Sequence, residues 1–361
     1  MTRLFAILAI IAGPWITNMH EDGFSVLWTT DEESIAWVQL EDGQRVYEEF
    51  AGRWAFGRLH QIRLRGLDAG RTVSYSIGSS PVIDHNSRRP KFGKEEVLGP
   101  FTTRTFSGAP DRCRFSIMND MHMNLPQYSA LAAQIDPSDC DFIQLNGDII
   151  SAGNHPLDSL VKYEISPLGE LAAHLPVMYC RGNHESRGDG IRLVSAIYPA
   201  EDELPFSYIF RQGPAAFLVL DSGETGVKNA MDQCGKPFYE DYLREQMEWV
   251  RKAVQSPEWK SAQQRFCFVH APMIDFGIPG DFVVHGWMNR NFVPILNEAG
   301  VNIMIAADYH EYIFTPAGRM GNDFPIIVND SRSRADVKVE GDNIAVDIYD
   351  VNGNITHSLR F

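Results

Sequence analysis

The sequence has little cysteine, no long apolar run and no surplus of basic residues. Its five cysteines are an odd number, and four of them lie in or beside apolar stretches. We therefore expect small buried side chains rather than a disulfide framework or a zinc ribbon. Lys and Arg number 32 against 47 Asp and Glu, which gives a net charge of −15. A nucleic-acid backbone needs a basic face and is not expected as a partner, but a local metal site could still attract a small phosphorylated substrate.

The first twelve residues form the most apolar segment near the N-terminus. Arg3 is followed by an apolar run over residues 4–12, with Ala12 before Gly13, as in a secretory signal. The run is too short to cross a bilayer, so no transmembrane segment is predicted. This pattern favours export to a periplasmic or extracellular location. The alternative is a cytoplasmic protein in which residues 5–11 form the first strand of the next domain.

Residues 13–106 carry the signals of short strands. Phe24, Val26 and Trp28 alternate with their neighbours, and a second alternating run covers residues 35–40 after a polar break. Tyr75 opens a further strand after a turn that contains glycine, which is typical of the tyrosine corner of immunoglobulin-like sandwiches. The region resembles a fibronectin type III-like β-sandwich. Residues 107–110, Ser-Gly-Ala-Pro, are the predicted linker.

Residues 111–361 change to an alternation of strands and helices. The pattern predicts strands over 114–118, 141–145, 177–180, 216–220, 265–269 and 303–306, and helices over 127–135, 159–174, 238–254 and 292–299. From residue 337 onward, apolar and polar residues alternate again, which indicates an antiparallel edge. We therefore predict a second, α/β domain with two sheets covered by helices.

Polar residues that can bind metals follow several of these strands directly. They are Asp120-Met121-His122, Gly147-Asp148, Gly182-Asn183-His184-Glu185, His270 and Ala307-Asp308-Tyr309-His310. Each segment alone is weak evidence, although a Gly-Asn-His-Glu tetrapeptide is expected by chance in about one such chain per thousand. Open α/β sheets bind ligands at the carboxyl ends of their strands. The ordered set therefore predicts one functional site.

The ordered set resembles the calcineurin-like metallophosphoesterase superfamily. With the N-terminal sandwich, the chain resembles purple acid phosphatases and their bacterial relatives. The resemblance implies two divalent metal ions (Mn, Fe or Zn), a bridging hydroxide as nucleophile, and a phosphate ester as substrate. It assigns Asp120, His122, Asp148 and His310 to the first metal, and Asp148, Asn183, His270 and Asp308 to the second. It also implies that Asn183 positions the phosphate and that His184 protonates the leaving oxygen.

The sequence departs from the family pattern at three positions. Ser151 stands where purple acid phosphatases have the tyrosine that colours their iron, so no purple iron is expected. Asp308 stands where a histidine of the second metal is expected, and Ala307 replaces a glycine. An additional carboxylate favours a hard ion such as Mn²⁺ over Zn²⁺. The alternative is that Asp308 is no ligand and the second metal is weak or absent.

Three further side chains near the motifs are candidates for the site. His155 could contact the substrate, or it could be a solvated loop histidine, and Arg187 could bind a phosphate or form a surface ion pair. Glu185 is predicted to orient His184.

The sequence thus predicts a metal-dependent phosphomonoesterase or phosphodiesterase. The competing hypothesis is a catalytically degenerate binding or adhesion protein that acts through its β-sandwich. The identity of the substrate does not follow from the fold.

Overall fold

The computed structural model describes residues 9–201, 203–225, 239–275 and 284–361. The chain divides into two compact units, residues up to 106 together with 169–176, and residues 107–168 together with 177–361. Most of the predicted signal segment, residues 1–12, lies outside the described residues, and its last three residues belong to strand β1 (Ile10–Thr17).

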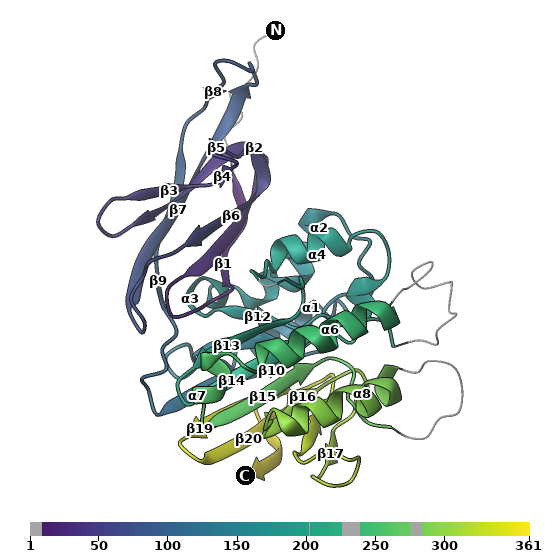
Figure 1. The fold of residues 1–361 in the computed structure, drawn as a ribbon. Coiled ribbons are helices and arrows are strands. Elements are labelled where there is room, and N and C mark those ends of the chain that lie inside the picture. The colour runs from purple at the N-terminus through teal and green to yellow at the C-terminus, as the bar shows by residue number, and fades with distance from the viewer. Residues whose placement is uncertain (1–8, 202, 226–238, 276–283) are drawn as a thin grey trace. The chain divides into compact units, whose positions relative to one another are not determined.

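The first unit is built almost entirely from antiparallel strands (Figure 1). They are β1 (Ile10–Thr17), β2 (Phe24–Leu40), β3 (Arg45–Tyr47), β4 (Glu49–Phe50), β5 (Arg53–Trp54), β6 (Gly57–Leu64), β7 (Thr72–Asp84), β8 (Lys91–Phe92) and β9 (Glu96–Arg104). Strand β2 pairs with β1, β3, β6 and β7, while β8 and β9 pair with β7. The predicted β-rich N-terminal region is thereby confirmed, and its assignment to the fibronectin type III class stays a prediction.

Strand β2 joins the two alternating runs that the sequence suggested as separate strands. Its first half pairs with β1 and β6, its second half pairs with β3 and β7, and the register with β6 shifts between Thr29 and Ser34. His60 Nε2 lies 2.8 Å from Ser34 Oγ and 3.1 Å from Thr30 Oγ1 at this bend. The polar break therefore bends the strand without ending it, because buried side chains bind one another there.

Tyr75 is buried, as expected for a corner tyrosine, but its partner is distant in the sequence. Its hydroxyl donates a 2.7 Å hydrogen bond to the carbonyl of Ala173, in the short helix α3 (Leu171–His174). Thr103 Oγ1 donates in the same way to the carbonyl of His174. Segment 169–176 thus belongs to the β-rich unit, although residues of the other unit flank it on both sides.

The second unit contains two six-stranded sheets and their covering helices. The first sheet has the order β12 (Val177–Tyr179), β11 (Phe142–Leu145), β10 (Arg112–Met118), β19 (Arg334–Glu340), β20 (Asn343–Tyr349) and β21 (Ile355–Arg360). The second has the order β13 (Tyr208–Gln212), β14 (Ala215–Leu220), β15 (Gln264–Val269), β16 (Ile303–Ala306), β18 (Ile326–Val328) and β17 (Ile313–Thr315). Strands β10 to β12 are parallel, as are β14, β15, β16 and β18, and the remaining pairs are antiparallel.

A layer of phenylalanines joins the two sheets of this unit. Phe115 of β10 meets Phe217 of β14 and Phe266 of β15 edge to face, with ring centroids 5.1 and 5.5 Å apart. Phe142 of β11 also packs edge to face on Phe217, at 5.1 Å. Each such aromatic pair contributes about 0.5–1.5 kcal/mol beyond the area that it buries. This aromatic contact holds the two sheets against each other.

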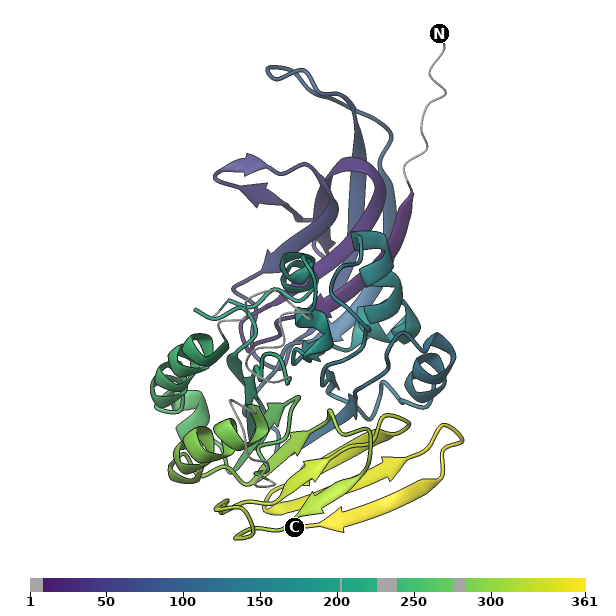
Figure 2. The ribbon, with the colours of Figure 1, turned by 90° about the vertical axis from the view of Figure 1, so that its right-hand side faces the viewer.

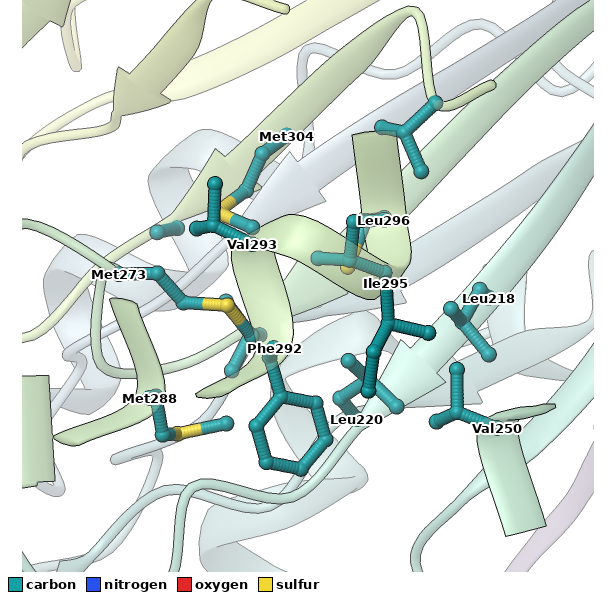
Figure 3. Packing of buried hydrophobic residues seen from close by; sticks show 14 of the residues in the cluster. Leu218, Leu220, Val250, Met273, Met288, Phe292, Val293, Ile295, Leu296 and Met304 are labelled. Carbon is teal, nitrogen blue, oxygen red and sulfur yellow. The ribbon is translucent and has the colours of Figure 1, made fainter. Parts of the chain in front are cut away.

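Helices cover the outer faces of the two sheets. They are α1 (Leu125–Ala132), α2 (Leu157–Glu164), α4 (Ile191–Ile197), α6 (Tyr239–Ala253), α7 (Pro257–Ser261) and α8 (Val284–Glu298), with short 3₁₀ turns at Ser166–Leu168 and His184–Ser186. Helices α6 and α8 lie side by side over the sheet of β14, β15 and β16 (Figure 1), and Phe292 and Leu296 of α8 pack among Leu220 and Met304 of its strands (Figure 3). In the rotated view the green helices lie on the opposite side of the unit from α1 (Figure 2), whose Leu131 carbonyl accepts a hydrogen bond from Arg334 of β19. The predicted two-sheet α/β domain is confirmed.

One predicted element is wrong and one begins earlier than expected. The helix predicted over 159–174 breaks after Glu164, because Pro167 lacks an N–H and Gly169 takes a φ of +57°. Helix α8 begins at Val284 rather than at residue 292. Cys113, Cys180 and Cys267 are free and buried, Cys140 is free and half-buried, and Cys234 lies outside the described residues. Among the described residues, no helix is long and apolar enough to cross a membrane.

Candidate metal centre

The residues singled out by the sequence lie at the ends of five neighbouring strands of the second unit. Asp120 and His122 follow β10, Asp148 follows β11, and Asn183 and His184 follow β12. In the other sheet, His270 directly follows β15, and Asp308 and His310 follow β16. Since β10 to β12 are parallel, as are β15 and β16, these loops meet at the same edge of their sheets.

The loops hold their side chains with backbone that is rarely seen outside glycine. Eight described residues other than glycine have a positive φ, and six of these lie in the site loops: Asp120, His122, Met123, Asp148, Asp308 and His310. Such a conformation costs about 1–3 kcal/mol per residue and is found at functional sites. Hydrogen bonds between loops offset part of that cost, for example from the Asp120 N–H to the Gly147 carbonyl (2.9 Å) and from the His122 N–H to the Asp148 carbonyl (3.0 Å).

Four side chains form a first group of possible metal ligands, namely Asp120, His122, Asp148 and His310. The Nε2 atoms of His122 and His310 lie 3.1 Å apart, and Asp120 Oδ1 lies 3.4 Å from His310 Nε2. Asp120 and Asp148 are buried, whereas the His310 side chain is 49% exposed. The group is therefore anchored in the core and accessible from solvent.

A second group shares Asp148 with the first and adds His270 and Asp308. His270 Nε2 lies 3.3 Å from Asp148 Oδ2 and 3.7 Å from Asp308 Oδ1. The Nδ1–H of His270 donates to the Asn146 carbonyl at 2.8 Å, which leaves Nε2 to face the carboxylates. Burial disfavours protonation of His270, but Asp148, Asp120 and Asp308 outweigh it and raise its pKa well above the ordinary value. The two groups together contain three carboxylates, Asp120, Asp148 and Asp308, and this negative charge suits cations.

The side-chain oxygen and nitrogen atoms that face the site fit a pair of metal ions. Among the described residues, Asp120 Oδ1, Asn183 Oδ1 and His270 Nε2 are buried and make no hydrogen bond. A buried polar atom without a partner costs about 1–3 kcal/mol, so three of them in one place need a common explanation. All three atoms can bind a metal, and two cations that share Asp148 would satisfy them.

Asp308, at the position that departs from the family pattern, points toward the second group. Its Oδ1 faces His270, and its Oδ2 lies 2.8 Å from His285 Nε2 on helix α8. Its N–H donates to Asp120 Oδ2 at 3.2 Å. Ala307 is not among the residues with positive φ, whereas Asp308 has a φ of +71°. The backbone therefore takes its unusual turn one residue after the expected glycine.

His184 and Arg187 lie together beside Asp148. The Nδ1–H of His184 donates to the Ser151 carbonyl at 2.8 Å, and its Nε2 lies 3.6 Å from Asp148 Oδ2. Arg187 Nη1 lies 2.7 Å from His184 Nε2. His155, the other candidate substrate contact, packs against Tyr163, with ring centroids 6.0 Å apart, and its role stays a prediction.

Two carboxylates have roles that sequence reasoning did not find. Glu185 does not bind the His184 side chain; it accepts hydrogen bonds from the N–H groups of Asp148, Ile149 and Gly182 at 2.8–3.0 Å. Glu224, which lies outside the sequence motifs, binds Asn183 and Arg187. Its position four residues after a fully apolar strand, β14, was the available signal.

Comparison with known proteins agrees with this geometry. Residues 113–312, more than half of the chain, match the calcineurin-like phosphoesterase family, and the chain belongs to that family. No curated protein sequence matches the chain significantly.

Two solved structures show the same fold at low sequence identity. A purple acid phosphatase from yellow lupin (Lupinus luteus) seeds aligns with 96% of this chain and 73% of its own, at a TM-score of 0.70 and 14% identity. GAP50 of Plasmodium, the anchor in the inner membrane complex, aligns with 69% of this chain and 88% of its own, at a TM-score of 0.52 and 14% identity. The first alignment includes the N-terminal β-rich region.

Proposed function

We propose that this protein is a metal-dependent phosphoesterase that hydrolyses a small phosphorylated substrate. The observation that carries the proposal is the pair of ligand groups that share Asp148. It is supported by three buried atoms that can bind a metal and that have no hydrogen bond among the described residues. When bound, two divalent cations supply Lewis acidity toward phosphate oxygens and lower the pKa of water. Their proposed ligands are Asp120, His122, Asp148 and His310 for the first cation, and Asp148, Asn183, His270 and Asp308 for the second.

The remaining chemistry falls to side chains that border the ligands. We assign the protonation of the leaving oxygen to His184, which is partly exposed and whose Nδ1–H is held by the Ser151 carbonyl. The Asn183 amide would orient the phosphate as well as bind a cation. His155 and Arg187 remain candidate substrate contacts, and the existing partners of Arg187 make a positioning role the better proposal for it.

The cation and the location follow from weaker observations. Three carboxylates among the ligands favour Mn²⁺ or a similarly hard ion. Export remains a proposal that rests on the apolar N-terminal segment. The fibronectin type III-like domain would then be carried outside the cytoplasm with the enzyme.

A substrate panel tests the proposal. Metal-free protein is loaded with Mn²⁺, Fe²⁺, Zn²⁺ or Mg²⁺ and assayed on phosphomonoesters and phosphodiesters. Metal-dependent hydrolysis of at least one class, highest with Mn²⁺, is expected. Tight binding of metal without hydrolysis of any ester would favour the alternative, a binding protein that keeps the site but not the activity.

A further inference from the structure

Glu224 contacts the candidate site without being one of its possible ligands. It follows strand β14 and is 6% exposed. Its Oε1 accepts hydrogen bonds from Asn183 Nδ2 at 3.1 Å and from the Thr225 N–H at 3.0 Å. Its carboxylate also binds Arg187, through Nε to Oε2 at 2.9 Å and through Nη2 to Oε1 at 3.1 Å. The carboxylate therefore has a fixed place and a fixed orientation.

The bond to Asn183 decides which end of that amide faces the metal groups. A carboxylate accepts hydrogen bonds and does not donate them, so only the NH₂ end of the amide can face Glu224. The amide oxygen then points the other way, and Asn183 Oδ1 is one of the buried atoms that find no hydrogen-bond partner in the described part of the chain. An amide binds a cation through oxygen and repels it through NH₂. The orientation of this one side chain thus decides whether it can be a ligand.

We infer that Glu224 is a positioning residue for the second cation: it aims the Asn183 oxygen at the site, and Arg187 braces it. This inference rests on the proposed function only in taking the site to bind two cations. Partners of this kind beyond the ligands typically contribute about 10–100-fold to metal affinity. The bidentate arginine pair adds geometric precision, because a planar guanidinium fixes the plane of the carboxylate.

Two substitutions at position 224 separate positioning from simple packing. Glu224→Ala removes every acceptor, so the Asn183 amide is free to turn. Glu224→Gln keeps one oxygen, which we expect at the place of Oε1 because three donors converge there: Asn183 Nδ2, Thr225 N–H and Arg187 Nη2. Asn183 should then stay in place while the bond to Arg187 Nε is lost. The matched control is Asp336→Ala, since Asp336 also forms a bidentate pair with an arginine, Arg334, outside the site.

The experiment is calorimetric titration of metal-stripped, full-length protein with Mn²⁺ alone. His310→Ala identifies the binding step that belongs to the first cation. In Glu224→Ala the Kd of the other step should rise at least about tenfold, while the first step stays within about threefold of wild type. In Glu224→Gln and Asp336→Ala both steps should stay within about threefold.

Equal weakening of both steps in Glu224→Ala, or wild-type values for both, would overturn the inference, and so would a wild-type titration with no second step. Because Glu224→Gln is nearly isosteric, a large loss of second-step affinity in that variant would also overturn it. Activity is measured separately on the same samples. If wild type binds two cations but hydrolyses no ester, the proposed function fails and the conclusion about Glu224 stands.

Discussion

Asp148 is the side chain on which both ligand groups depend. Its Oδ1 accepts the His184 N–H at 2.9 Å, and its Oδ2 lies 3.3 Å from His270 Nε2. Burial raises the pKa of Asp148, but His270 and His184 outweigh burial and lower it to about 2. Gly147, just before it, has no room for a side chain, because a Cβ there would lie 2.5 Å from His270 Nδ1. Asp148, in the loop that follows β11, therefore serves both ligand groups.

Replacing His184 by alanine should slow turnover and spare the metals. The side chain lies beside the ligand groups and is assigned to proton transfer, which typically contributes about 10²–10⁴-fold. The loss should be large for alkyl phosphates and small for nitrophenyl phosphate, whose leaving group needs little protonation. Rates on both esters and metal analysis of the purified variant measure this.

The control for that experiment is His357→Ala, because His357 is exposed and stacks on Tyr312. It should behave as wild type on both esters. Loss of metal from His184→Ala would show that the proton-donor assignment is wrong.

Replacing Asp308 by histidine should shift the preference among cations. Two divalent ions with the carboxylates of Asp120, Asp148 and Asp308 have a formal charge of +1, against +2 with a histidine at position 308. The variant should gain affinity for Zn²⁺ relative to Mn²⁺, and activity on dianionic monoesters relative to monoanionic diesters. Competitive metal titration and paired ester assays measure these ratios. If Asp308→Ala binds metals with wild-type stoichiometry and affinity, Asp308 is no ligand.

At the scale of elements, Glu185 ties the loop after β12 to the loop after β11. It is fully buried, and its carboxylate accepts N–H groups from Asp148, Ile149 and Ile150 of one loop and from Gly182 of its own. Gly182 must be glycine for this approach, because a Cβ would lie 2.2 Å from Asp148 Oδ1. The two loops are therefore held as one rigid support for the ligands.

Glu185→Gln should destabilise the α/β unit although it barely changes the shape of the side chain. Its NH₂ group would face backbone N–H donors, and a buried donor without a partner costs about 1–3 kcal/mol. We expect a loss of this order in the free energy of unfolding, measured by urea denaturation. Glu340→Gln, at the exposed end of β19, should change it by less than about 0.5 kcal/mol. Equal stability of the two variants would contradict the proposed tie.

The sequence predicted elements where one local pattern dominates and failed where distant residues decide. The apolar runs 114–118, 141–145, 177–180, 265–269 and 303–306 became strands, and the polar residues that follow them became the candidate site. The break after Glu164 was missed because apolar periodicity continues through Pro167 and Gly169. The partners of Glu224 and of Asp308 were also missed, since Asn183 and His285 come near them only through the fold.

At the scale of the whole molecule, the chain order does not follow the order of the two units. Segment 169–176 leaves the α/β unit and binds the β-rich one, through the Tyr75 hydroxyl on the Ala173 carbonyl and the parallel bridge from Ile16 to Pro176. A boundary at residues 107–111, as the sequence predicts, remains a proposal for the main division. Removal of residues 13–106 would take away the partners of this segment.

Tyr75→Phe tests how firmly that segment is held. The substitution leaves the ring and removes the donor, so the buried Ala173 carbonyl loses its 2.7 Å bond. Local opening of residues 169–176 should become easier by about 1–3 kcal/mol, which is about 5–150-fold faster hydrogen exchange. Tyr47→Phe, whose ring stacks on Trp54 in the same unit, serves as the control and should leave exchange there unchanged. Unchanged exchange in Tyr75→Phe would show that the bond does not hold the segment.

The most direct test of the central claim is the metal content of wild type and of Asp148→Asn after loading with Mn²⁺ and gel filtration. Wild type should retain about two ions per chain, because the two ligand groups share one carboxylate. Asp148→Asn should lose both the ion pair and the activity on phosphate esters, and circular dichroism should show the fold of the wild type. Retention of two ions by the variant, with a rate near that of wild type, would contradict the dinuclear site.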